Sequence, residues 1–236
     1  MKKFILIAML CVMPVIMACA TTQDHAVKAT AYYKMGVAYL NENKIQQAFV
    51  EFHKAYELDP RNKEVLNAIG YIYLIHLDKP GEAIGYFNKA VDLDPDYSDA
   101  YNNLGYAYEK SGNFEKAIAY YKKAISNPVY PTADRTYINL GSSYYRLGRY
   151  DDAMTALKEA IKRNPDFFLP YMKLALCYNA LGKYGDASTA ITRAIELDPA
   201  YKGDKEKARE DLTLKKMQAT GYDEQEIRDY LEILKY

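Results

Sequence analysis

The chain has 236 residues, with 31 Lys and Arg residues against 31 Asp and Glu residues, so its formal net charge is zero. Half of the residues are apolar by a count that includes Ala and Tyr, which is enough for a continuous hydrophobic core. Because no long basic run is present, the composition argues against a nucleic-acid partner held through phosphate contacts.

The N-terminus has the features of a targeting segment. Lys2 and Lys3 precede an apolar run from Phe4 to Ala18, about 15 residues, which is shorter than the roughly 20 that a membrane-spanning helix needs. The run leads into Ile-Met-Ala-Cys at residues 16–19, which resembles a bacterial lipobox with Cys19 as the lipidated residue. Residues 1–18 are therefore predicted to be a lipoprotein signal peptide. The alternative is an ordinary signal peptide followed by a fortuitous cysteine.

Lipidation of Cys19 would attach the mature chain to a bilayer by burial of acyl chains. The resemblance to enterobacterial lipoproteins implies the outer membrane, because Ala20 and not aspartate follows the cysteine. We therefore expect a protein of the bacterial cell envelope, lipid-anchored in the outer membrane and facing the periplasm, with residues 19–28 as a polar tether. Cys177 lies among leucines on a predicted helix and is expected to be a small buried hydrophobic side chain.

A pattern of two amphipathic helices joined by a tight turn recurs with a period of about 34 residues. Five copies are predicted, at residues 29–62, 63–97, 98–133, 134–167 and 168–201. Small residues are expected where the two helices of a copy come closest, and these are Gly36, Gly70, Gly105, Gly141 and Ala175. Prolines end four of the copies, at Pro60, Pro95, Pro165 and Pro199. Since neither helix of a copy can bury its apolar face alone, the copies must stack.

These positions resemble the tetratricopeptide repeat, or TPR. The resemblance covers residues 29–201 and implies an all-α fold, a right-handed superhelix or α-solenoid. After Pro199 the pattern stops, and residues 202–236 are predicted to form C-terminal capping helices, with a degenerate sixth unit as the alternative. Asp223 followed by Glu226 suggests a capping pair at the start of a last helix.

The joint between the third and fourth copies carries a second resemblance. Two extra residues lie there, and Pro128 and Pro131 favour an extended segment. The segment from Ala124 to Gly141 reads AISNPVYPTADRTYINLG and resembles the corresponding segment of the type IV pilus biogenesis lipoproteins of the PilW/PilF class. This resemblance implies a pilotin, an outer-membrane TPR lipoprotein that helps the pilus secretin reach the membrane and multimerise.

The sequence shows no catalytic or metal-binding pattern. His25, His53 and His76 are scattered without ligand spacing, and neither a glycine-rich phosphate loop nor a Gly-x-Ser-x-Gly motif occurs. We therefore expect a binding protein and not an enzyme, with no cofactor and no metal. The expected partner is a protein or peptide, and the pilus resemblance implies a secretin subunit. The alternative function is an envelope adaptor lipoprotein that scaffolds cell-wall hydrolases or synthases.

Binding in a stack of this kind uses the inner groove that the first helices of the copies line. The residues predicted to line it point away from the contact within each copy: Tyr33, Asn67, Tyr71, Asn102, Asn103, Tyr106, Arg135, Asn139, Ser142, Tyr145, Met172 and Leu176. Tyrosine offers a large contact area at low entropy cost, and asparagine can both donate to and accept from a peptide backbone. The groove should therefore suit an extended or helical peptide. The alternative is that Asn103 and Asn139 bond only to neighbouring backbone inside the stack.

Overall fold

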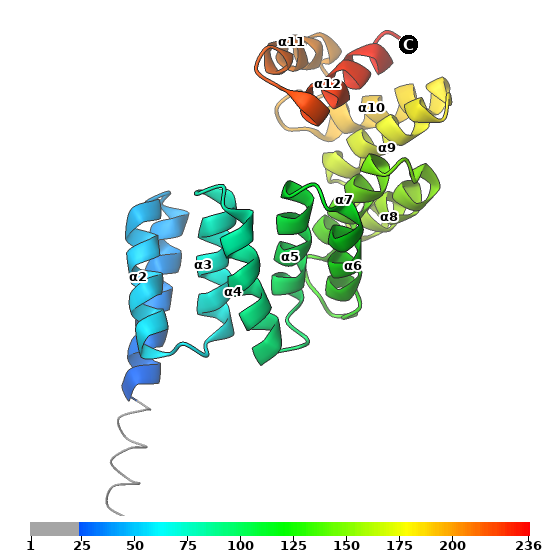
Figure 1. Ribbon diagram of the computed structural model, residues 1–236. Coiled ribbons are helices and arrows are strands. Elements are labelled where there is room, and N and C mark those ends of the chain that lie inside the picture. The colour runs from blue at the N-terminus through cyan, green and yellow to red at the C-terminus, as the bar shows by residue number, and fades with distance from the viewer. Residues whose placement is uncertain (1–23) are drawn as a thin grey trace, which may run out of the picture. The chain divides into compact units, whose positions relative to one another are not determined.

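The computed structural model describes residues 24–236, and the regular structure in that range is helical throughout. A first helix covers residues 24–41. The helices that follow are α2 (Ile45–Leu58), α3 (Lys63–Ile75), α4 (Pro80–Leu93), α5 (Ser98–Lys110), α6 (Phe114–Ile125), α7 (Ala133–Arg146), α8 (Tyr150–Arg163), α9 (Phe168–Ala180), α10 (Tyr184–Leu197), α11 (Lys205–Lys216) and α12 (Gly221–Ile233). They follow one another as helix pairs, as Figure 1 shows. The predicted signal peptide and Cys19 lie outside the described residues.

The first helix begins earlier than the first predicted repeat. Residues 24–28, which were predicted to belong to the polar tether, are already helical. The carboxylate of Asp24 lies 2.6 Å from the ammonium group of Lys28, one turn later, and both side chains are exposed. Such a pair supports a helix locally. The described part of the tether is therefore a helical turn.

A residue in the left-handed region of backbone space closes the turn within each of the five predicted repeats. These residues are Asn43, Asp78, Gly112, Gly148 and Gly182, with φ between 49° and 75°. Glycine adopts this conformation without steric cost, and Asn and Asp tolerate it better than other side chains do. Prolines lie at the ends of the repeats, where they stop the second helices. Helices α2, α4, α8 and α10 each end two residues before a proline.

The two helices of a pair approach closely where the repeat carries a small residue. A Cβ atom added to Gly70 would lie 2.6 Å from Cε1 of Phe87, and one added to Gly105 would lie 2.5 Å from the ring of Tyr121. No carbon atoms pack that closely, so only glycine fits opposite a buried aromatic ring. In the fourth pair the residue opposite Gly141 is Leu157, and an added Cβ would still lie 2.8 Å from its Cγ atom. In the fifth pair Ala175 and Ile191 are buried in one cluster.

The chain folds as two compact bodies, residues 24–103 and residues 104–236, with the boundary inside α5. The N-terminal body has a core built on Ala48, Phe52, Ala55, Val65, Ile69 and Ile72. The C-terminal body has one cluster formed by α6 to α9 and a second formed by α9 to α12.

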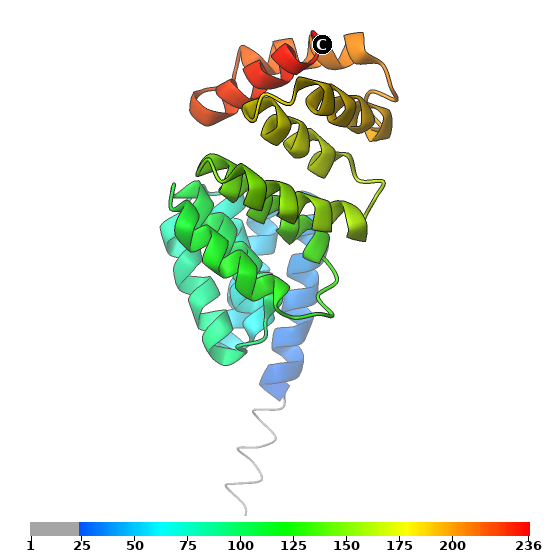
Figure 2. The same cartoon turned by 90° about the vertical axis from the view of Figure 1, so that its right-hand side faces the viewer.

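The last helix pair does not pack as the preceding pairs do. In the C-terminal body the first helix of a pair packs on the second helix of the pair before it, as α7 does on α6 and α9 does on α8. In the last pair, α12 packs on both α9 and α10, while α11 packs on α10 and α12. In Figure 2, α11 and α12, coloured orange and red, lie at the end of the C-terminal body, next to the yellow α10. The second helix of this pair therefore takes the contact with α9 that a first helix would make in a regular repeat.

Candidate functional site on the first helices

The residues predicted to line a groove are distributed over both bodies. The N-terminal face is our name for the five in residues 24–103: Tyr33, Asn67, Tyr71, Asn102 and Asn103, all partly buried. The C-terminal face is our name for the seven in residues 104–236: Tyr106, Arg135, Asn139, Ser142, Tyr145, Met172 and Leu176.

An amide contact joins two first helices on the N-terminal face. Nδ2 of Asn103 on α5 donates to Oδ1 of Asn67 on α3 at 2.9 Å, and the side chain of Asn67 also bonds to Tyr97. Asn103 therefore bonds inside the stack, but to a side chain and not to the neighbouring backbone that the alternative interpretation gave as its partner. This contact uses one N–H of Asn103, and an asparagine amide has two N–H donors and a carbonyl acceptor.

Two tyrosines on or beside this face stay protonated. Burial raises the pKa of the Tyr33 hydroxyl, and the nearby carboxylates of Glu64 and Asp99 raise it further. Burial likewise raises the pKa of Tyr97, with the same two carboxylates adding to the shift. Both hydroxyls are therefore hydrogen-bond donors at physiological pH. The N-terminal face can offer amide and phenol groups to a peptide backbone beside a flat aromatic surface.

The C-terminal face is dominated by charges that the sequence analysis did not select. Glu226 on α12 is 8% exposed, and its carboxylate lies 2.8 Å from the Arg146 guanidinium and 2.6 Å from the Lys173 ammonium group. Arg146 also lies 3.4 Å from Asp223. Asp223 and Glu226 therefore do not form the predicted capping pair. The N-cap of α12 is Thr220, which makes no capping hydrogen bond with its side chain.

A second carboxylate lies beneath this cluster. Oε2 of Glu109 accepts hydrogen bonds from the Tyr121 hydroxyl at 2.8 Å and from Oγ of Ser143 at 3.1 Å. Burial raises the pKa of Glu109, and the two hydrogen bonds and the positive charges of Lys173 and Arg146 only partly oppose that rise. Two cations and two carboxylates thus form a partly desolvated network in the C-terminal body.

Helix α12 covers part of the C-terminal face. Leu176 is 1% exposed and belongs to the cluster that contains Tyr230 and Ile233, so it does not line an open groove as predicted. Tyr145 and Met172 pack against the same cluster, and the Tyr145 hydroxyl donates to Oδ2 of Asp229 at 3.4 Å. The prediction failed for Leu176 because the repeat pattern ends before α12 and says nothing of where that helix packs.

The remaining residues of this face differ in exposure. Arg135 is exposed, whereas Asn139 and Ser142 are partly buried. Tyr106 packs against the core cluster that α6 to α9 form. One signal for the charged network was present in the sequence. Glu109 occupies the repeat position at which the first two copies carry Leu40 and Leu74.

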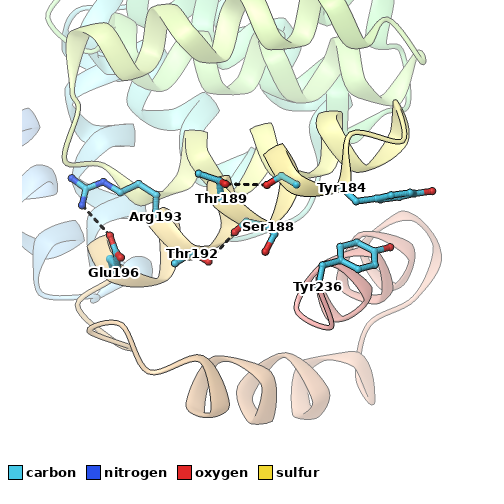
Figure 3. A pocket seen from close by; sticks show the side chains of 8 residues that line it. Tyr184, Ser188, Thr189, Thr192, Arg193, Glu196 and Tyr236 are labelled. Atoms are coloured by element: carbon cyan, nitrogen blue, oxygen red, sulfur yellow. Dashed lines mark hydrogen bonds and ion pairs between the residues drawn. The ribbon is translucent and has the colours of Figure 1, made fainter.

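A separate depression of about 680 Å³ lies on the exposed side of α10. The residues that line it are Tyr184, Gly185, Ser188, Thr189, Thr192, Arg193, Glu196 and Tyr236 (Figure 3). The hydroxyls of Thr189 and Thr192 donate to carbonyls of their own helix at 2.9 and 2.8 Å, and Arg193 pairs with Glu196 at 3.2 Å. Because these polar groups are already engaged within α10, the depression offers few converging groups to a ligand.

The described residues give little indication of a metal site or of a reactive side chain. Between residues 24 and 236, no group of three or more His, Cys, Asp or Glu side chains is placed to hold a metal ion. Cys177 is fully buried, as predicted, and burial raises the pKa of its thiol to about 12. None of the helices in this part of the chain is both long and apolar enough to span a membrane.

Comparison with known proteins places most of the repeats in one family. Models of the tetratricopeptide repeat match residues 29–62, 98–127 and 138–202, and a model of the TPR repeat matches residues 81–112. Together the matched segments make up more than half of the chain. No curated protein matches the sequence.

Several solved structures are similar to this chain over most of its length. PilF of Pseudomonas aeruginosa is 19% identical with a TM-score of 0.70, and the match covers 88% of this chain and 90% of that one. PilW, a widely conserved type IV pilus biogenesis factor, is 21% identical with a TM-score of 0.68, covering 86% and 90%. MamA is 29% identical with a TM-score of 0.60, covering 72% and 91%. With five pairs that share small residues at their closest approach, and with repeat models matched along them, the chain belongs to the tetratricopeptide-repeat proteins.

Proposed function

We propose that this protein is an outer-membrane lipoprotein that works as a protein-interaction scaffold and acts as a pilotin for a type IV pilus secretin. The observation that carries the proposal is the extent of the structural similarity. The matches to PilF and PilW cover 88% and 86% of the chain, a larger share than the five repeats at residues 29–201 can supply. The similarity to the pilus proteins therefore extends beyond the repeats, whereas the MamA match covers 72%.

In this proposal the two ends of the chain have different tasks. Acyl chains on Cys19 hold the protein at the bilayer, and several chains together give stable attachment. The N-terminal face binds a peptide region of a secretin subunit through Tyr33, Tyr71 and the Asn67–Asn103 amide pair. The bound subunit is then carried to the membrane, where subunits multimerise. The role is binding and not catalysis.

A first experiment tests the pilotin function in cells that make the secretin. Without this protein, the secretin should remain monomeric, and a Cys19→Ala variant should fail to restore multimers although its repeats still fold. The readout is the heat-stable secretin multimer on a denaturing gel. Normal multimers in the absence of the protein would refute the proposal.

A second experiment tests the binding surface. A photoreactive residue in place of Tyr71, on the N-terminal face, should crosslink to secretin in intact envelopes. The matched control is the same residue at Asp92, which is exposed on α4. Equal crosslinking from both positions would exclude the N-terminal face as the specific surface. Capture of cell-wall hydrolases or synthases instead of secretin would favour the envelope-adaptor function.

A further inference from the structure

Helix α12 reaches further back along the chain than a terminal helix of a stack needs to. It packs on α9 and α10, the helices of the pair before it. Its Glu226 also pairs with Arg146 on α7, which belongs to the pair before that one. Lys173 on α9 completes the contact from the other side. Helix α12 thus lies on the C-terminal face, where a bound helix would lie.

The contact has an apolar half beside its acidic half. Tyr230 and Ile233 of α12, and Leu234 directly after it, are buried in a cluster with Leu176 of α9 and Ile191 of α10. One side of the helix carries all of these groups. Tyr230, Ile233 and Leu234 lie four, seven and eight residues after Glu226, which is the spacing of residues on one face of a helix. The surface therefore recognises an amphipathic helix that carries a carboxylate one turn before its apolar residues.

The connection that leads to α12 is exposed where α11 ends. Helix α11 buries only Ala208 and Leu212, while Leu214 and Met217 near its end are 62% and 77% exposed. Gly221 then takes a φ of 60°, which lets the chain change direction before α12. Helix α12 is thus held by α11 as well as by α9 and α10, and Nη2 of Arg209 on α11 donates to the backbone carbonyl of Leu234 at 3.1 Å.

From these contacts we infer that the C-terminal face is a docking site for an acidic amphipathic helix of a partner protein, and that α12 is the intramolecular occupant which that helix displaces. The inference rests on the proposed scaffold function for the statement that the partner is a protein. The partner helix carries an acidic residue at its first position, an aromatic residue four positions later and aliphatic residues seven and eight positions later. Its carboxylate replaces Glu226 between Arg146 and Lys173, because a vacated site would leave two partly buried cations unpaired.

The test uses the full chain and a labelled peptide of residues 218–236 as the probe. A Glu226→Lys chain, whose own α12 faces two like charges, should bind the wild-type peptide about 100-fold more tightly than the wild-type chain does. The matched control is Glu232→Lys, because Glu232 is exposed and, among the described residues, pairs with Lys235, which lies two residues after the end of α12. This control should bind like the wild type. A peptide that itself carries Glu226→Lys should bind at least tenfold more weakly than the wild-type peptide.

Several outcomes would overturn the inference. Equal binding of the probe by the two lysine variants would do so, as would equal binding of the two peptides. A Glu226→Lys chain that forms dimers through exchanged α12 and ignores the added peptide would identify a second copy as the occupant instead. If that variant does not fold, amide hydrogen exchange on the wild type decides: the α12 amides should exchange faster than those of α9 and α10, and equal rates contradict displacement. Because secretin is absent from these assays, their failure leaves the pilotin proposal standing.

Discussion

Replacement of Gly70 by alanine tests the close approach of paired helices. An added Cβ would lie 2.6 Å from Cε1 and 2.8 Å from Cδ1 of Phe87, a fully buried ring. Overpacking of this kind costs about 1–3 kcal/mol, and the better helix propensity of alanine returns about 1 kcal/mol. We expect Gly70→Ala to lower the free energy of unfolding by about 1 kcal/mol.

The control for this prediction lies in the same body. Gly85 on α4 has nothing within 4 Å of an added Cβ, so Gly85→Ala should gain about 1 kcal/mol from helix propensity alone. The difference between the two variants in urea unfolding, with unchanged dependence on urea concentration, isolates the steric cost. Adding Phe87→Ile to Gly70→Ala copies the fifth pair, and should recover about 1 kcal/mol of coupling. Equal stabilities for the two alanine variants, or additive effects in the double variant, would refute the reasoning.

Three further predictions concern the C-terminal body. Because the folded-state pKa of Glu109 is raised, its contribution to stability is fully present below its unfolded pKa of about 4.3 and is lost as pH rises through the folded pKa. The stability of the wild type relative to Glu109→Gln should therefore fall as the pH rises above about 4 in urea titrations, and a rise in relative stability would contradict the shift. Tyr121→Phe, which removes a 2.8 Å bond to Glu109, should cost about 1–3 kcal/mol, whereas Tyr145→Phe, with a 3.4 Å contact to Asp229, should cost less than about 0.5 kcal/mol in the same assay. Cys177 should resist alkylation in the native protein and react only as urea opens the fold, because its thiol is fully buried with a pKa of about 12; site-specific mass spectrometry measures the modified fraction, and rapid labelling without urea would argue against this burial.

The regular part of the fold was predictable because packing constrains it directly. The spacing of small residues such as Gly70 and Gly105 follows from the close approach of two helices, and the structure places large buried side chains opposite them. From the positions of the prolines we could predict where the second helices end. Helices α2, α4, α8 and α10 each end two residues before a proline. Local chemistry determines these features, so one sequence is enough to predict them.

The position of α12 could not be predicted in the same way. An apolar stripe predicts that a helix is buried on one side, but it does not say which neighbour provides the other surface. Glu226 was interpreted as a local capping residue because of its spacing from Asp223, whereas its partners Arg146 and Lys173 lie far away in the sequence. A contact between distant residues leaves no periodic signal, and this is why the predicted groove included Leu176, which α12 buries.

Departures from the repeat pattern nevertheless point to the surface that α12 covers. Leu40 and Leu74 occupy one repeat position in the first two copies, and the next two copies carry Glu109 and Tyr145 there. Glu109 lies beneath the cations that pair with Glu226, and Tyr145 donates to α12. Glu109 finds its hydrogen-bond partners, Tyr121 and Ser143, inside the stack, whereas the partner of the Tyr145 hydroxyl is Asp229 on α12. A buried polar residue at a position that is apolar in other copies must find a hydrogen-bond partner to avoid a desolvation cost, and for Tyr145 that partner lies on an element outside the repeats, the acidic amphipathic helix α12.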